Sequence, residues 1–337
     1  MRAWIVDHPA PIDQGPLRLV ERDAPVPGPG QVRVRVRACG VCRTDLHLAE
    51  GDLPPRRPGV TPGHEIVGTV DALGEGAQRF ALGERIGIAW LARTCGACRF
   101  CRAGQENLCL SPRFTGWDDD GGFAEYAVVD ERYAYRLPDA FADDVAAAPL
   151  LCSGIIGYRA LRRAQLPHYG RLGIYGFGAS AHLTAQIAVH EGATVHVLTR
   201  SEDARQLALS LGAASARGAT DRPPEPLDAA IVFAPAGELV PLALEALDRG
   251  GTVAVAGIHL TDIPELTYQQ HLFQERTLTS VTANTRSDGE ELLAAASRLS
   301  LEVTTTPYPF EQADQALADL AHDKVHGAAV LVMDAGS

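Results

Sequence analysis

A short apolar strand followed directly by a glycine turn and a helix is the feature that most limits the fold of this chain. The strand is predicted at residues 171–175 (RLGIY), the turn at 176–181 (GFGASA) and the helix at 179–190. A second apolar strand follows at 194–199, and strands and helical stretches continue to alternate as far as residue 256. Strands that alternate with helices in this way indicate an α/β fold with a parallel, doubly wound sheet.

The glycine turn matches the pattern G-x-G-x-x-A, which predicts a dinucleotide site where a strand precedes it and a helix follows. In this pattern Gly176 makes the tight turn, and Gly178 admits the pyrophosphate close to the backbone. The phosphates then lie on the free backbone N–H groups at the start of the helix, around Ala179 and Ser180. The segment therefore predicts a dinucleotide cofactor.

The end of the second strand leaves the identity of that cofactor open. A domain that binds NAD usually carries Asp or Glu here to hold the ribose hydroxyls, but this chain has no acid at the expected place. Arg200 or Arg205 could accept the 2′-phosphate of NADP, whereas Thr199 could hydrogen-bond a ribose hydroxyl of NAD. Both NAD(H) and NADP(H) therefore stay as candidates.

The first 149 residues show a different pattern, rich in predicted strand. Residues 32–37 (VRVRVR) alternate with a period of two, so their valines face one side of a strand and their arginines the other. Apolar runs recur between Gly- and Pro-rich turns and suggest a small barrel-like module. We expect a β-rich domain over residues 1–149, the doubly wound domain over 150–283, and a return to the first domain over 284–337.

Four cysteines within a short lobe, at about residues 93–111, predict a metal site. Their spacing is C-x2-C-x2-C-x7-C, formed by Cys95, Cys98, Cys101 and Cys109. Four thiolates this close in sequence can converge on one tetrahedral ion. Free surface thiols, local disulfides and an iron–sulfur cluster are the alternatives, and zinc is favoured over each. Because four ligands leave no vacant position, such a site is structural.

The bulk properties of the chain exclude some classes of partner. A net charge of −12 argues against nucleic acid, which needs a basic surface. No apolar run approaches the length that spans a bilayer, and no secretory segment stands at the N-terminus, so no membrane partner and a cytoplasmic location are expected. Seven cysteines, an odd number, are poor material for a disulfide framework.

Three further candidates for metal ligands are scattered along the chain. They are Cys42 within Cys39-Gly-Val-Cys, His64 within Pro62-Gly-His-Glu, and Cys152 within Leu150-Leu-Cys. Two cysteines and a histidine would leave one coordination position free, which is the arrangement of a catalytic zinc. Spacing alone supports this weakly, because a lone buried Cys or His is more often a packing residue.

These motifs, taken in order with the four-cysteine lobe, resemble the zinc-containing medium-chain alcohol dehydrogenases, and the resemblance covers essentially the whole chain. It implies a GroES-like β-rich catalytic domain, a Rossmann cofactor domain, and two zinc ions per subunit. It also implies that Cys42, His64 and Cys152 bind the catalytic zinc, with Glu65 as an alternate ligand and Cys39 as a packing residue. Asp45 would orient the ligand histidine.

The resemblance further implies a reversible hydride transfer between an alcohol and NAD(P), giving an aldehyde or ketone. A proton would pass from the zinc-bound alcohol to Thr44, then through the cofactor ribose to His47 at the surface. Toward the cofactor, Arg43 matches a pyrophosphate-binding position, and the segment from Asn284 to Arg286 resembles one that meets the nicotinamide side. A small-molecule substrate and a homodimer or homotetramer are expected on the same ground.

Two alternatives stay open at this point. One is a zinc-dependent aldehyde reductase that works mainly with NADPH; the other is a non-catalytic zinc- or nucleotide-binding protein. The intact ligand sets argue against a zinc-free quinone or enone reductase of the same superfamily. Four apolar residues, Trp90, Leu91, Phe114 and Trp117, match segments near the substrate cleft of relatives and suggest a bulky apolar substrate, although core packing would explain them equally.

Overall fold

The computed structural model describes residues 1–257 and 260–333, which form two compact units. Unit 1 comprises residues 1–152, 283–297 and those from 303 on, and unit 2 comprises residues 153–282 and 298–302. The sequence placed the changes of domain after residues 149 and 283. The chain passes between units after Cys152 and Thr282, and returns briefly to unit 2 at the end of a helix.

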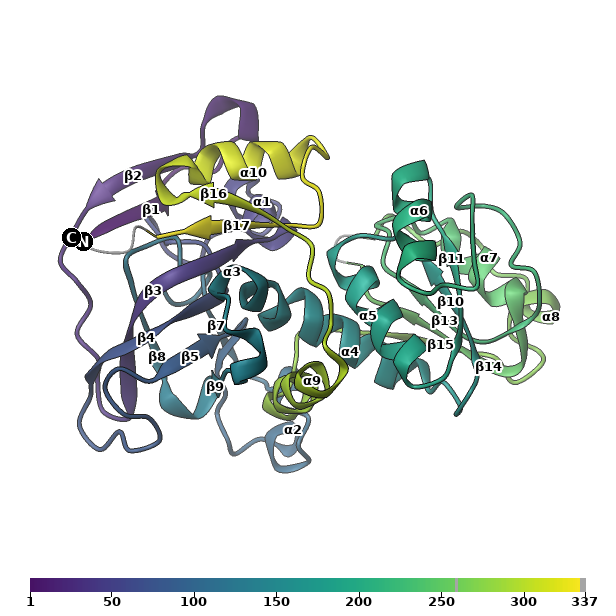
Figure 1. Ribbon diagram of the computed structural model, residues 1–337, viewed down its shortest axis with the longest axis horizontal. Helices are drawn as coiled ribbons and strands as arrows, with labels where there is room; N and C mark the ends of the chain where they lie inside the picture. Colours follow the sequence, from purple (N-terminus) through teal and green to yellow (C-terminus); the bar gives the residue numbers. More distant parts are fainter. Residues whose placement is uncertain (258–259, 334–337) are drawn as a thin grey trace. The chain divides into compact units, whose positions relative to one another are not determined.

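Unit 2 contains the predicted doubly wound sheet, and that prediction is confirmed (Figure 1). All five strand pairs are parallel, in the order β12-β11-β10-β13-β14-β15. Numbered along the chain this is 3-2-1-4-5-6, the order of dinucleotide-binding sheets. The strands are β10 (Arg171–Tyr175), β11 (Thr194–Leu198), β12 (Ser215–Arg217), β13 (Leu227–Val232), β14 (Leu247–Val255) and β15 (Thr277–Ser280).

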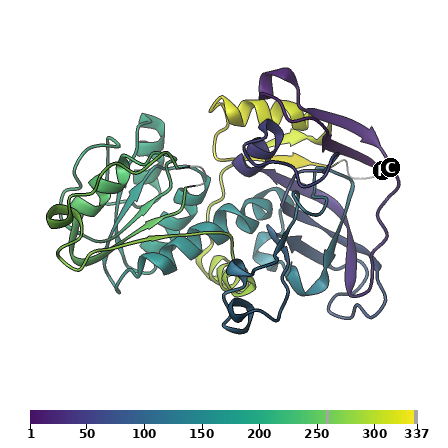
Figure 2. The same cartoon turned by 180° about the vertical axis from the view of Figure 1, so that it is seen from behind.

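Helices cover both faces of this sheet, so its central strands are mostly apolar; Arg171 and Asp228, near the start of β10 and β13, pair with each other. Ala230 and Val232 of β13 belong to one buried cluster with the apolar side of α7, so the alternate residues of that strand face the opposite side of the sheet. Helices α4 and α5 lie against each other, and the same unit is seen from behind in Figure 2. The helices of unit 2 are α4 (Ser153–Ala164), α5 (Ala179–His190), α6 (Glu202–Ser210), α7 (Leu239–Ala246) and α8 (Tyr268–His271).

Unit 1 is rich in strand, as the sequence predicted. Its largest sheet has the order β16-β17-β3-β4-β5-β9, with β8 paired to β3, and two smaller sheets join β1 to β2 and β6 to β7. The strands are β1 (Arg2–Val6), β2 (Leu17–Glu21), β3 (Gln31–Val41), β4 (Glu65–Leu73), β5 (Arg85–Ile88), β6 (Leu91–Arg93), β7 (Arg113–Phe114), β8 (Tyr126–Asp130), β9 (Ala134–Arg136), β16 (Thr305–Pro309) and β17 (Ala328–Val332).

Strand β3 explains why this sheet has an inside and an outside. Val32, Val34 and Val36 are buried, while the arginines between them lie at the surface. The period-two pattern of the sequence is therefore the burial pattern of the strand. Short helices close the unit: α1 (Arg43–Glu50), α2 (Arg99–Arg102), α3 (Asp144–Ala147), α9 (Arg286–Leu299) and α10 (Ala313–Ala321).

Among the described residues, no single helix has both the length and the apolar character needed to cross a membrane. One bent pair, Asp144–Leu151 with Ser153–Ala164, passes the test together by length and composition only.

Candidate functional site: two metal centres and a dinucleotide turn

The four cysteines of the lobe converge as predicted. Their sulfur atoms all lie within 4.8 Å of one another, and the Sγ of Cys101 is 3.9 Å from that of Cys95 and 3.5 Å from that of Cys98. Tetrahedral thiolates at about 2.3 Å from zinc would be separated by about 3.8 Å. The spacing of the sulfurs therefore fits one zinc ion, with all four positions filled by protein.

Backbone N–H groups in the lobe prepare the sulfurs to carry negative charge. The N–H of Cys98 donates to Cys95 Sγ at 3.3 Å, and the N–H groups of Cys95 and Ser111 donate to Cys109 Sγ at 3.3 and 3.4 Å. Hydrogen bonds from the backbone lower the pKa of Cys98 to about 6. A thiolate is the form that binds metal, so the loop is folded for an ion.

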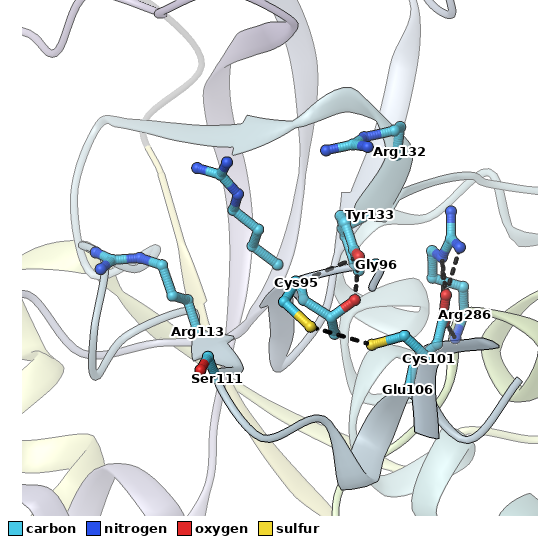
Figure 3. Close-up of a pocket in the computed structure, with 11 residues that line it drawn as sticks. Cys95, Gly96, Cys101, Glu106, Ser111, Arg113, Arg132, Tyr133 and Arg286 are labelled. Carbon is cyan, nitrogen blue, oxygen red and sulfur yellow. Dashed lines mark hydrogen bonds and ion pairs between the residues drawn. The ribbon is translucent and has the colours of Figure 1, made fainter. Parts of the chain in front are cut away.

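A cavity of about 390 Å³ lies beside this lobe, and Figure 3 shows Cys95 and Cys101 among the residues that line it. Its walls connect the lobe to the rest of unit 1. The hydroxyl of Tyr133 lies 2.7 Å from that of Thr94, and the guanidinium of Arg286 hydrogen-bonds the carboxylate of Glu106. The lobe is thus attached at both ends of its cysteine run.

The three ligand candidates that are scattered along the sequence also lie close together in the structure. Cys42 precedes α1, His64 precedes β4, and Cys152 follows a short 3-10 helix, yet the three side chains and Glu65 have ligand atoms within 4.8 Å of one another. Cys152 Sγ is 3.9 Å from Cys42 Sγ and 3.3 Å from His64 Nε2. These separations match a tetrahedral zinc site with one cysteine–cysteine and one cysteine–histidine edge.

Asp45 lies beside this site and accepts hydrogen bonds from two of its segments. The carboxylate is buried, accepts hydrogen bonds from the backbone N–H groups of Cys42 and Gly63 at 2.9 Å each, and lies 3.4 Å from His64 Nδ1. With Nδ1 turned toward Asp45, Nε2 is the nitrogen left for the metal. One carboxylate thus orients two segments that are far apart in sequence.

Burial and close approach shift the pKa values of these side chains. A hydrogen bond from Cys152 outweighs burial and holds the pKa of Cys42 well below its usual value. Burial raises the pKa of Glu65 well above its ordinary range, and the nearby charge of Cys42 adds to this rise. Gly40 leaves the space that Glu65 occupies, since a Cβ at that glycine would lie 1.9 Å from its carboxylate oxygen.

Helix α1 carries the two predicted relay residues one turn apart. Thr44 is buried, with its hydroxyl 3.7 Å from Cys42 Sγ. His47 lies three residues further, on the same side of the helix, and its Nδ1 is 3.0 Å from a carboxylate oxygen of Asp52, which is 55% exposed. Thr44 thus lies beside the ligand cluster, and His47 lies beside an exposed carboxylate. Sequence patterns gave no sign of Asp52, because it lies beyond the end of the helix.

Three residues matched to cofactor contacts lie in unit 1, and two of them have acidic partners. Arg43 pairs with Asp323 at the surface. Arg286 pairs with Glu106, as described above, and Asn284 is buried with its amide 3.3 Å from the hydroxyl of Tyr135. Neither acid could be predicted from the sequence, since both come from distant parts of the chain.

The two glycines of the turn in unit 2 differ in conformation and in the space around them. Gly176 has φ +86°, in the left-handed region that favours glycine, and a Cβ there would lie 2.8 Å from the backbone N of Ala234. Gly178 caps the N-terminus of α5 in an extended conformation, and a Cβ there would meet nothing within 4 Å. The first glycine is thus required by the protein itself, while the second leaves open space beside the helix start.

Two arginines, Arg200 and Arg205, follow the end of β11 and differ in their contacts. The guanidinium of Arg205 pairs with Glu202 and donates to the backbone oxygens of Thr199 and Arg200 at 3.0 Å each. The side chain of Arg200 is exposed and has no hydrogen bond or ion pair among the described residues. Of the two arginines considered for a 2′-phosphate, Arg200 is therefore the one available.

Comparisons with known proteins agree with this geometry. Residues 28–139 match the alcohol dehydrogenase GroES-like domain, and residues 181–298 match the zinc-binding dehydrogenase domain. A probable alcohol dehydrogenase, AdhA, of Mycobacterium tuberculosis is 58% identical, with 99% of this chain and 97% of that protein aligned. An alcohol dehydrogenase of Geobacillus stearothermophilus is 34% identical over 94% of this chain and 95% of that protein.

Solved structures extend the likeness to the backbone. A cobalt- and zinc-bound thermostable alcohol dehydrogenase from Pyrobaculum aerophilum has a TM-score of 0.88 at 25% identity, over 98% of this chain and 99% of that one. A cinnamyl alcohol dehydrogenase from Sorghum bicolor has a TM-score of 0.87 at 26% identity, over 98% and 97%.

Proposed function

The chain belongs to the zinc-containing medium-chain alcohol dehydrogenases, a family of NAD(P)-dependent oxidoreductases, and on this basis we propose how its residues work. The proposed reaction is a reversible hydride transfer between an alcohol and the nicotinamide cofactor, which yields an aldehyde or ketone. The observation that carries this proposal is the convergence of Cys42, His64 and Cys152 into a three-ligand set with a buried hydroxyl, that of Thr44, beside it.

The donor set fits a zinc ion with one position free for substrate. A zinc ion bound there would act as a Lewis acid and lower the pKa of a bound alcohol hydroxyl toward neutrality, as it lowers that of bound water to about 7. The chain's own part is to accept and remove that proton. We assign its acceptance to Thr44, whose hydroxyl lies 3.7 Å from Cys42 Sγ, and its transfer to solvent to His47, whose Nδ1 lies 3.0 Å from Asp52.

Residues that would hold the cofactor are proposed on the same basis. The open backbone at Gly178 and the first N–H groups of α5, at Ala179 and Ser180, would bind the pyrophosphate. In unit 1 we assign cofactor contacts to Arg43, Asn284 and Arg286 by resemblance.

One set of assays tests the reaction. Metal analysis should give two zinc ions per chain, and Cys42→Ala should keep one zinc and lose turnover while the melting temperature stays close to that of the wild type. Cys39→Ala is the matched control, because Cys39 is buried outside the ligand cluster. One zinc or none in the wild type, or full turnover by Cys42→Ala, would contradict the proposal.

The free side chain of Arg200 and the absence of an acid at the end of β11 favour one alternative, a reductase that works mainly with NADPH. Comparing kcat/KM for NAD and NADP with one simple alcohol, and for NADH and NADPH with its aldehyde, decides between the two. We further propose a cytoplasmic location, because a reducing compartment keeps the metal-binding thiols free of disulfides. By resemblance to the family we also propose a homodimer or homotetramer; mass photometry measures the assembly.

A further inference from the structure

Three aromatic rings stand side by side next to the open metal centre. Trp90 lies 5.0 Å from the ring of His64, at an angle of 72°. The ring of Trp90 is nearly parallel to those of Phe114 and Trp117, with centroids 4.9 and 6.1 Å away and interplanar angles of 17° and 11°. Phe114 and Trp117 are 5.8 Å apart at 25°. We call Trp90, Phe114 and Trp117 the aromatic wall.

The position of the wall follows from the paired strands β6 and β7. Trp90 directly precedes β6, Phe114 ends β7, and the two strands pair at Leu91 and Phe114. The N–H of Thr115 donates to the backbone oxygen of Trp90 at 2.9 Å. Phe114 is buried, whereas Trp90 and Trp117 are half-buried, so the wall keeps some open surface.

Trp117 lies outside strands β6 and β7, and the guanidinium of Arg56 lies over its ring. The Arg56 guanidinium carbon lies 3.8 Å from the ring centroid, a close cation–π contact. The same guanidinium donates to Asp118 at 2.6 Å, and the Asp118 carboxylate, 7% exposed, accepts from the N–H of Phe114 at 2.9 Å. The indole N–H of Trp117 donates to the backbone oxygen of Pro54 at 2.9 Å.

A second ion pair attaches the same segment without touching the wall. Arg57 pairs with Asp120, whose carboxylate also accepts from the N–H of Thr61 at 2.9 Å. The segment from Pro54 to Arg57 is therefore joined to the turn at 117–120 by two ion pairs and by the hydrogen bond from Trp117 to Pro54. Of these two ion pairs, only that of Arg56 includes a contact with an aromatic ring. Loss of Arg57 would therefore loosen the segment alone, whereas loss of Arg56 would also remove the contact that orients Trp117.

We propose that Arg56 is a positioning residue for substrate selectivity, which keeps Trp117 parallel to Trp90 so that flat aryl groups are preferred over saturated rings. This rests on the proposed function, since the selected molecule is the alcohol that is oxidised. A substrate oxygen bound beside His64 brings its carbon skeleton next to Trp90. Parallel aromatic surfaces favour a planar ring, which stacks on them, over a puckered ring of the same size.

The test uses benzyl alcohol and cyclohexylmethanol, which differ in flatness and hardly in size. The quantity is the ratio of their kcat/KM values, because the fraction of active enzyme cancels from it. The wild type should prefer benzyl alcohol, and Arg56→Ala should lower the ratio about tenfold, the scale of one lost aromatic contact. Arg56→Lys, which keeps the cation but not the planar fork, should recover part of the preference.

Arg57→Ala is the matched control and should leave the ratio unchanged while it breaks the other ion pair. The proposal is overturned if Arg56→Ala keeps the wild-type ratio, or if Arg57→Ala lowers it as much. If Arg56→Ala does not fold, Arg56→Lys decides, since an unchanged ratio would overturn the proposal and a partial fall would support it. A wild type that oxidises no alcohol with either cofactor would instead refute the proposed function, so the two failures are distinct.

Discussion

The two glycines of the dinucleotide turn should respond to the same substitution in opposite ways. In Gly176→Ala the new Cβ would lie 2.8 Å from the backbone N and 2.9 Å from the Cβ of Ala234, with the backbone at φ +86°. Alanine in the left-handed region costs about 1–2 kcal/mol, and overpacking of this kind costs about 1–3 kcal/mol. After the gain of about 0.4–1 kcal/mol from a less flexible unfolded chain, we expect a net loss of about 1–5 kcal/mol.

Gly178→Ala should leave the fold intact and weaken the binding of the nicotinamide cofactor. The new Cβ meets nothing within 4 Å, and the backbone at φ −105° suits alanine. The added methyl would occupy the space where the pyrophosphate approaches. We therefore expect the Kd for the nicotinamide cofactor to rise at least about tenfold, which corresponds to a loss of about 1.4 kcal/mol of binding free energy.

Thermal unfolding and cofactor titration measure both effects. Gly176→Ala should lower the melting temperature by about 5–15 °C, and Gly178→Ala should change it little. Binding is followed by the fluorescence of the reduced cofactor. The reasoning is refuted if Gly176→Ala is as stable as the wild type, or if Gly178→Ala binds the cofactor with an unchanged Kd.

The remaining predictions concern the metal centres and acid stability. Cys98→Ser should remove one zinc per chain and unfold the lobe, seen as zinc loss and faster proteolysis near residue 100; a zinc-replete variant would contradict the closed site. Asp45→Asn places an NH2 group against the backbone N–H of Cys42 or Gly63, so zinc affinity at the open site should fall about 10–100-fold; equal affinity in a chelator competition would contradict this. Burial works to raise the pKa of Glu106, but hydrogen bonds from Arg286 outweigh it and hold the pKa below 4.5. The ion pair therefore stabilises the fold above pH 4.5 and loses its effect as pH falls through the lowered value, so Glu106→Gln should lower the melting temperature at pH 7 and match the wild type in acid. A difference in melting temperature between Glu106→Gln and the wild type that persists or grows in acid would contradict this pH dependence.

Local patterns in the sequence predicted the elements that local physics controls. The alternation of valine and arginine in residues 32–37 predicted the buried and exposed sides of β3, and the glycine turn predicted its strand and helix. The short strands β12 and β15 at the two edges of the unit 2 sheet were not predicted, because edge strands gain their order from a neighbour more than from their own residues.

The two metal centres show where sequence reasoning ends. The cysteines of the lobe span only fifteen residues, from 95 to 109, so chain connectivity alone keeps their sulfurs close. Cys42 and Cys152 are 110 residues apart, and their sulfurs lie 3.9 Å from each other only because β3, β4 and the 3-10 helix before Cys152 pack together. Spacing predicted the first site directly, whereas the second needed the family resemblance.

The sequence by itself thus determined the doubly wound sheet, the glycine turn and the closed zinc site, because each depends on residues close together along the chain. Only the tertiary structure decided which charges face one another. It placed Glu106 on Arg286, Asp52 on His47 and Arg56 over Trp117, and it left Arg200 without a partner among the described residues. The Glu106 and Arg56 contacts join segments far apart in sequence, and Asp52 lies beyond the helix that carries His47, so none of these contacts leaves a periodic trace in the sequence.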